Sequence, residues 1–188
     1  DDEVLSQYSD GLVLTSGCMG SMVSQHLMNG DYQAARKQAA AHRDMVGKDR
    51  YYVEIMRHGF AEQDKLIGEQ LRLAKDLGLG LVATNDSHYT EEGDSVGHDV
   101  LLCVQMKTKI NDPNRMRFES DQFYFKSPRE MWELFPEDEF PGACENTLKI
   151  AGMVDDDIQV STTDHLLPGF PIPDNEAGRA ALDEAKAK

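Results

Sequence analysis

The most chemically suggestive residues are Asp86 and His88, which follow the apolar run Leu81–Asn85. Such a short run is typical of a buried β-strand. In an extended chain, side chains two positions apart point to the same face, about 6.6–6.8 Å apart along the strand, so the two side chains should project together. Carboxylate and imidazole both bind zinc, manganese and iron. The alternative is that Asp86 caps the following loop and that His88 is a hydrogen-bonded core histidine.

Cys18 offers a thiol just beyond a second strand-like run, Gly11–Ser16, and a short helix should begin after it. A helix N-terminus favours the thiolate, the form of cysteine that binds metal. The alternative is a small buried residue, which is the usual role of a free cysteine. With Asp86 and His88, Cys18 would make a ligand set that suits zinc or a similar transition metal, but it does not fill a coordination sphere.

Two further polar residues, Glu54 and His58, belong to a third strand-like run and the turn after it, Tyr51–Gly59. His58 could line the same pocket or hydrogen-bond a substrate, and Glu54 could orient a metal ligand from behind. The alternative is that His58 is an ordinary loop residue and that Glu54 is a solvated strand position. His98, which precedes Asp99, suits either a helix surface or packing.

The elements that position these residues alternate between strands and helices. Strands are expected at 11–16, 51–56 and 81–85, and the helical periodicity covers 31–46 and 62–77. This order predicts an α/β fold with parallel strands and helical crossovers. Parallel strands end at one edge of the sheet, where α/β folds place their active sites.

Beyond residue 94 the pattern becomes mostly helical. The sequence predicts helices over 96–104, from Ser127 to a stop at Pro136, and over 141–154, with a short aromatic strand at 123–125. Ser127 followed by proline and, three positions on, by glutamate is a strong helix start. A boundary is expected beyond Asp155, where prolines become frequent.

The composition excludes several classes of protein. The chain has 188 residues, 40% hydrophobic and 28% charged, which is a globular balance. With 19 basic and 34 acidic residues its net charge is −15, which argues against an autonomous nucleic-acid binder but not against one domain of a larger nucleic-acid enzyme. No run reaches the ~18 apolar residues of a membrane span.

The first residues and the cysteines bear on where the protein works. Asp1–Glu3 are acidic, the reverse of a signal peptide, and the helical character of residues 1–10 without an initiator Met suggests a segment of a longer protein. Three widely spaced cysteines predict no disulfide framework and a reducing, cytosolic compartment. Of these, Cys103 and Cys144 lie in helical patterns and are expected in the core.

Eight stretches, in order, resemble the alpha subunits of bacterial DNA polymerase III, which are C-family replicative polymerases. They are GLVLTSGCMG (11–20), YVEIMRHG (52–59), LVATNDSHY (81–89), HDVLLCVQ (98–105), DPNRMRF (112–118), FYFKSPREM (123–131), NTLKIA (146–151) and LLPGFPIP (166–173). The resemblance implies that residues 1–155 are the C-terminal part of a polymerase-and-histidinol-phosphatase (PHP) domain. Residues 156–188 would then be a linker and the start of the palm. The implied fold is part of a distorted, TIM-like (β/α) barrel with a mostly helical C-terminal extension.

The resemblance also implies a site. Cys18 matches the family's cysteine ligand, and Asp86 and His88 match its final Asp-x-His pair. In family members that keep these ligands, divalent metal ions, here zinc or manganese, support a 3′–5′ exonuclease that removes misincorporated nucleotides. The remaining ligands and the polymerase aspartates, which are the catalytic residues of DNA synthesis and use magnesium, match no position of this chain.

As a polymerase segment, the chain should work in the cytoplasm with DNA and deoxynucleoside triphosphates, with a sliding clamp and clamp loader as partners, and with no membrane. The segment by itself should be inactive. Two other interpretations remain open: a stand-alone PHP-family metal-dependent phosphoesterase and a metal-free structural PHP module.

Overall fold

A computed structural model describes residues 2–158, 175, 178–180 and 183–184. The chain divides into two units, Asp1–Val154 and Asp155–Lys188, and the fold and the site below belong to the first. The proline-rich stretch and the LLPGFPIP motif lie outside the described residues. No helix among those described combines the length and apolarity needed to cross a bilayer.

The centre of the first unit is a three-stranded parallel sheet in the order β1-β2-β3. Its strands are β1 (Leu14–Thr15), β2 (Tyr51–Ile55) and β3 (Gly80–Ala83). The helices α2 (Met22–Met28) and α3 (Tyr32–Val46) connect the first two strands, and α4 (Ala61–Leu77) connects the last two. The prediction of parallel strands with helical crossovers is confirmed.

The first strand is shorter than the predicted range 11–16. Gly11 and Gly17 both have positive φ angles, 74° and 77°, and each turns the chain away from the direction of the strand. Only Leu14 and Thr15 therefore pair as a strand, and the amide of Ser16 extends the ladder with one more bond, to the carbonyl of Tyr52 (2.9 Å).

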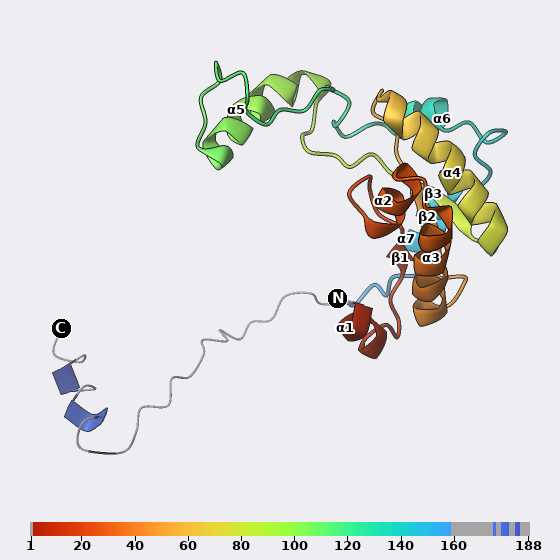
Figure 1. The fold of residues 1–188 in the computed structure, drawn as a ribbon, viewed down its shortest axis with the longest axis horizontal. Coiled ribbons are helices and arrows are strands. Elements are labelled where there is room, and N and C mark those ends of the chain that lie inside the picture. The colour runs from red at the N-terminus through yellow and green to blue at the C-terminus, as the bar shows by residue number, and fades with distance from the viewer. Residues whose placement is uncertain (1, 159–174, 176–177, 181–182, 185–188) are drawn as a thin grey trace. The chain divides into compact units, whose positions relative to one another are not determined.

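The core forms where α2, α3 and α4 gather beside the sheet (Figure 1). Every residue of β2 is buried, as expected for a central parallel strand. α3 contributes Ala35, Ala39 and Val46 at helical spacing, each no more than 1% exposed. Small alanines on this face let the helix approach the sheet closely, so the helices and the sheet share one core.

The turn before α7 (Glu145–Ala151) and the first residues of that helix cover the outer edge of β3. The amide of Ala83 donates to the carbonyl of Ala143 (2.9 Å), and the side-chain amide of Asn146 donates to the carbonyl of Leu81 (2.7 Å). These bonds satisfy backbone groups that an edge strand would otherwise leave open. The helix predicted from 141 therefore begins later, because the residues before it form this turn instead.

The region beyond β3 contains α6 (Pro128–Leu134), η1 (Glu92–Asp94) and α5 (Ser95–Met106), and α1 (Asp2–Gln7) opens the chain. α6 begins at the predicted capping box, in which Ser127 and Glu130 bind each other's backbone amides. The predicted strand at 123–125 is reduced to one isolated bridge, between Tyr89 and Tyr124. Of the two cysteines expected in the core, Cys103 is buried and Cys144 is partly buried.

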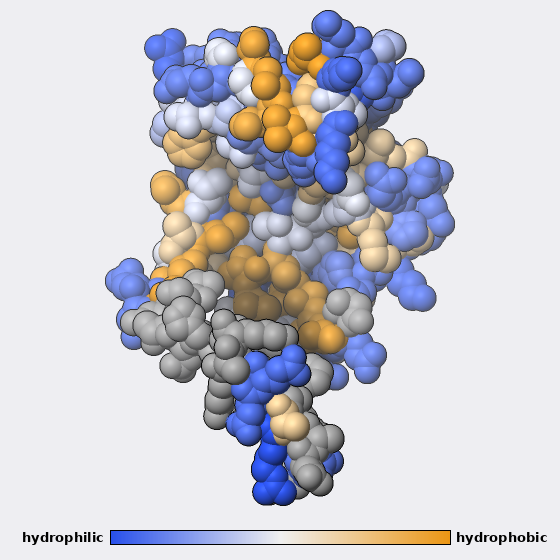
Figure 2. Space-filling view, turned by 90° about the vertical axis from the view of Figure 1, so that its left-hand side faces the viewer, coloured by the Kyte–Doolittle hydropathy of each residue, from blue (hydrophilic) through white to orange (hydrophobic). Residues whose placement is uncertain are grey.

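α5 carries an apolar face that the described residues leave uncovered. Val96, Leu101 and Val104 are 73%, 66% and 72% exposed. Apolar residues accordingly gather in the upper part of the face in Figure 2, where α5 lies. Arg115 ties the loop after α5 back to the helix through a bidentate pair with Asp99 (2.5 and 2.6 Å).

We expect Phe135→Ala to lower the free energy of unfolding by about 3–5 kcal/mol, because it removes a ring from the core. Phe135 is 1% exposed, packs edge-on against Phe140 with centroids 5.4 Å apart, and lies under the guanidinium of Arg57. Urea denaturation followed by circular dichroism measures the loss. Phe125→Ala is the control, since Phe125 is 74% exposed, and it should change stability by less than about 0.5 kcal/mol. Equal effects of the two substitutions would show that this packing is misassigned.

Candidate functional site

Each residue singled out by its spacing lies just beyond a strand of the sheet, apart from Glu54, which lies within β2. Cys18 follows β1, His58 follows β2, and Asp86 and His88 follow β3. Because the three strands are parallel, all of these positions lie at one edge, the carboxyl edge of the sheet.

Asp86 and His88 face each other across a short distance. The Oδ1 atom of Asp86 is 3.6 Å from Nε2 of His88, and the side chains are 43% and 37% exposed. The alternative roles, a core histidine and a loop cap, do not fit. His88 is not a core residue, and Asp86 accepts no capping hydrogen bond from a described residue. The pair offers an accessible carboxylate and imidazole.

The reason for this proximity differs from the predicted one. The strand ends at Ala83, so strand alternation does not bring the side chains together. Instead, Asp86 adopts a left-handed backbone conformation, with φ at 46°. A non-glycine residue held there costs about 1–3 kcal/mol and persists only where its surroundings enforce it. The amide of His88 donates to the carbonyl of Phe123 (2.8 Å), which fixes the chain just beyond this turn.

Cys18 lies exposed on the turn that follows Gly17, which excludes the buried-residue alternative. A side chain at Gly17 would meet Ser21 at 3.1 Å in addition to the strain of its positive φ, so glycine is required there. Cys18 borders a crevice of about 10 Å³ together with Glu54 and Gln63. That volume has room for about one water molecule.

The structure unites two of the three predicted metal ligands. Asp86 and His88 are paired, but within residues 2–158 and the few described beyond them no three His, Cys, Asp or Glu side chains form a group that could hold a metal ion. Cys18 thus shares the edge with the pair without joining it. The three-residue ligand set stays a prediction.

Glu54 is buried and accepts several hydrogen bonds, so it is not a solvated strand position. Its carboxylate accepts hydrogen bonds from the hydroxyls of Thr15 and Thr84 (both 2.6 Å) and from the amide of Gly17 (3.2 Å). The donors come from β1, from the end of β3 and from the turn before Cys18. One carboxylate therefore joins the carboxyl ends of all three strands.

His58 is 2% exposed, and both of its ring nitrogens are engaged. Nε2 donates to the carbonyl of Asn85 (2.7 Å), and Nδ1 accepts from the side-chain amide of Gln63 (2.8 Å). The ring stacks on Phe123 with centroids 4.0 Å apart. Burial lowers its pKa, so His58 is neutral and holds the residue next to Asp86 in place.

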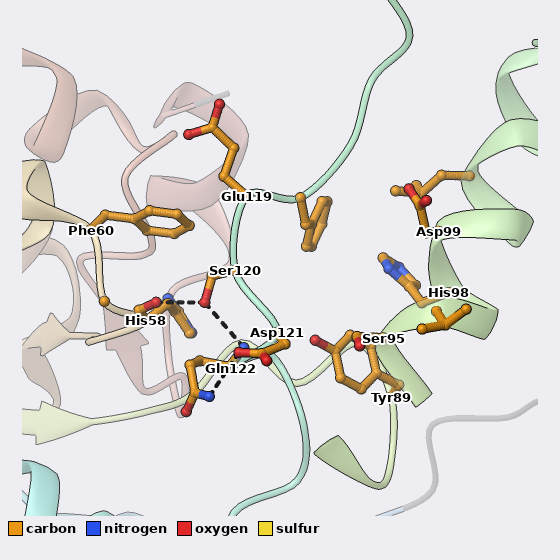
Figure 3. A pocket seen from close by; sticks show the side chains of 14 residues that line it. His58, Phe60, Tyr89, Ser95, His98, Asp99, Glu119, Ser120, Asp121 and Gln122 are labelled. Carbon is orange, nitrogen blue, oxygen red and sulfur yellow. Dashed lines mark hydrogen bonds between the residues drawn. The ribbon is translucent and has the colours of Figure 1, made fainter. Parts of the chain in front are cut away.

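A groove of about 600 Å³ next to the pair was not predicted from the sequence. Its walls include Tyr89, His98 and Phe118, and Figure 3 shows Tyr89 and His98 across from Phe60. The rings of His98 and Phe118 lie 5.4 and 4.8 Å from that of His88, measured between centroids. These residues come from separate segments with no shared spacing, so only tertiary structure brings them together.

Comparison with known proteins identifies relatives of this chain. Residues 1–58 match the family model of the PHP domain, a range that includes Cys18, Glu54 and His58. DNA polymerase III subunit alpha of Treponema pallidum is 38% identical over 173 residues, that of Mycobacterium tuberculosis (strain CDC 1551) 37% over 174, and that of Thermus aquaticus 37% over 186.

These alignments cover 92%, 93% and 98% of the chain. The chain spans only 14–15% of the length of these curated relatives. The similarity therefore extends over nearly all of this chain but covers only one segment of each relative.

We expect Glu54→Gln to destabilise the fold by about 1–3 kcal/mol. The NH₂ group of glutamine would replace one acceptor oxygen and face a group that itself donates a hydrogen bond. Urea denaturation measures the change. Glu133→Gln on the surface is the matched control and should be nearly neutral. If Glu54→Gln were as neutral as the control, the carboxylate would not hold the strand ends.

We expect the stability of the fold to decrease as the pH falls below about 6.5, with His58 contributing. Its folded-state pKa lies below the ordinary value of 6.5, so the unfolded chain takes up a proton first and gains free energy from it. Asp86 opposes this lowering of the pKa and Lys126 reinforces it. Nitrogen-15 NMR should find a neutral ring protonated at Nε2 at pH 7. A ring that titrates at or above 6.5 would contradict the assignment.

Proposed function

Because the chain is homologous to the PHP-containing region of bacterial DNA polymerase III subunit alpha, we propose that it is part of the catalytic subunit of a bacterial replicative DNA polymerase. The observation that carries the proposal is 38% identity sustained over 92% of the chain. Under this proposal residues 1–155 are the C-terminal part of the PHP domain and 156–188 lead into the palm. The three-stranded sheet would be part of a distorted (β/α) barrel.

The relatives favour this function over the two alternatives. A stand-alone PHP phosphoesterase would not be expected to match polymerase subunits far beyond residues 1–58, which the PHP family model covers. A metal-free structural module would not need an accessible carboxylate and imidazole held together by a strained backbone. That pair supports a module with chemistry of its own.

We propose that Asp86, His88 and Cys18 are the ligands of a divalent metal in this module, although Cys18 lies outside the pair in the structure. The donor set fits zinc or manganese, because carboxylate, imidazole and thiolate are all ligands for such ions. The pair is exposed, and its carboxylate is not engaged by other hydrogen bonds among the described residues. A bound metal would activate water and stabilise charge on phosphoryl oxygens, which is the chemistry of a 3′–5′ exonuclease.

Glu54 and His58 act as positioning residues in this proposal. Both oxygens of Glu54 and both ring nitrogens of His58 are already hydrogen-bonded, so neither is available as a ligand. Glu54 fixes the strand ends that carry the candidate ligands. His58 fixes Asn85, and through it the turn at Asp86.

The same proposal extends to cofactors and partners. DNA synthesis by the polymerase would use magnesium at aspartates that match no position here. Its substrates would be DNA and deoxynucleoside triphosphates, its partners a sliding clamp and a clamp loader, and its compartment the cytoplasm. The acidity of this segment, −15, implies that other parts of such an enzyme supply the positive charge for DNA.

We expect Asp86→Asn to weaken Mn²⁺ binding by about tenfold or more, because it removes the charged ligand of the pair. Isothermal titration of the chain with Mn²⁺ measures the affinity. Cys18→Ser should weaken Zn²⁺ binding more than Mn²⁺ binding, since a thiolate is the softer ligand. In a polymerase subunit that contains this segment, Asp86→Asn should lower removal of a mismatched 3′ nucleotide and spare DNA synthesis.

Asp10→Asn is the matched control, since Asp10 is exposed and remote in sequence from the pair. It should leave both metal affinities unchanged. Equal Mn²⁺ affinity in the Asp86→Asn and Asp10→Asn variants would contradict the metal assignment. Unchanged mismatch removal by a subunit that carries Asp86→Asn would contradict the exonuclease.

A further inference from the structure

The groove beside Asp86 and His88 is lined by ring and polar groups from three segments. Figure 3 shows His58 and Phe60 on one side, Tyr89, Ser95 and His98 on the other, and the segment that carries Ser120 running between them. Its volume of about 600 Å³ suits a molecule of nucleoside size. Ser120 anchors the floor by donating to the carbonyl of His58 (2.6 Å) and accepting from the amide of Gln122 (3.1 Å).

Aromatic rings form a continuous wall between this groove and the pair. The ring of Phe118 lies 4.9 Å from that of His98 and 4.7 Å from that of Phe123, centroid to centroid, at steep angles. Its packing holds it in one orientation, while it stays only partly buried. A ring fixed this way is a platform on which a planar base can stack.

Some polar groups in the groove lack partners in the described part of the chain. The hydroxyl of Tyr89 is buried and meets no hydrogen-bond partner in good geometry there; burial raises its pKa, and the nearby backbone of Phe123 partly offsets that rise. The ring nitrogens of His98 and the hydroxyl of Ser95 also make no hydrogen bond to a described residue. His98 and Ser95 are partly exposed in the groove, so a ligand with a polar edge can hydrogen-bond to them.

The charges at the groove select among possible occupants. Glu119 and Asp121 are exposed carboxylates, whereas Asp99 is neutralised by Arg115. Neither Glu119 nor Asp121 has an ion-pair partner among the described residues, so both repel a phosphate. The occupant is therefore a neutral ring with hydrogen-bond donors on its edge. Nucleobases combine a planar face with such an edge.

We propose that this groove binds an unstacked nucleobase of a DNA strand whose sugar–phosphate lies at Asp86 and His88. The proposal rests on the proposed function, since it places the base of the terminal nucleotide next to the phosphoesterase centre. His88 connects the two, because its ring contacts both His98 and Phe118. The base stacks on Phe118, and its polar edge meets Ser95 and His98.

The test is an NMR titration of the chain with deoxyadenosine in metal-free buffer. The amide signals of Tyr89, His98 and Phe118 should shift and saturate. Phe118→Leu keeps apolar bulk and removes the stacking ring, so it should weaken binding by about tenfold. Ser95→Ala removes a hydroxyl that lines the groove and should weaken binding by about fivefold.

Phe125→Ala serves as the aromatic control, because Phe125 is exposed and does not line the groove. Its affinity for deoxyadenosine should be unchanged. Absence of saturable shifts, or equal affinity of folded Phe118→Leu, would overturn the proposal. So would equal shifts with 2-deoxyribose 5-phosphate, which has no base.

The proposed function and this inference fail separately. If Mn²⁺ binding does not depend on Asp86 but deoxyadenosine still binds, the phosphoesterase centre is wrong and the groove stands. If Mn²⁺ binds as expected and deoxyadenosine does not bind, only the groove is wrong.

Discussion

The carboxylate of Glu54 is the interaction on which the carboxyl edge of the sheet depends. Two threonine hydroxyls and the amide of Gly17 reach it from both neighbouring strands and from the turn before Cys18. A buried anion is tolerated when several donors share its charge. Because the donors are fixed by the sheet and the acceptor lies on the central strand, the three strand ends cannot move independently. The positions of Cys18 and of the turn at Asp86 follow from that restraint.

A second layer of restraint acts on the chain beyond β3. His58, neutral and fully engaged, holds the carbonyl of Asn85, while the side-chain amide of Asn85 donates to the carbonyl of Tyr124 (2.6 Å). The turn at Asp86 is thus held by hydrogen bonds from the loop after β2, through His58, and from the segment that contains Tyr124. This explains how a left-handed aspartate persists. The stability of the surroundings offsets the backbone strain that brings a carboxylate against His88.

Much of this arrangement could be predicted from local patterns. The α/β order, the crossovers α3 and α4 and the capping box at Ser127 all follow from periodicity and capping chemistry, which act within a few residues. Homology to the polymerase subunits was also recognisable from ordered motifs, and the relatives bear it out. What local patterns could not supply was anything joined over a long sequence distance. The sequence leaves Glu54 open between a positioning role and a solvated strand position, because its donors lie 30 to 39 residues away.

Because the outer edge of β3 is covered, the sheet can be extended only at the edge formed by β1. Ala143 and Asn146 occupy the hydrogen-bonding positions along its outer edge, whereas β1 pairs only with β2 among the described residues. Growth of the sheet by a further strand is therefore one-sided and begins at Leu14 and Thr15. A further strand of the proposed barrel, or a strand from a second copy of the chain, would have to pair with that same backbone. Folding and self-association thus compete for the same unpaired edge of β1.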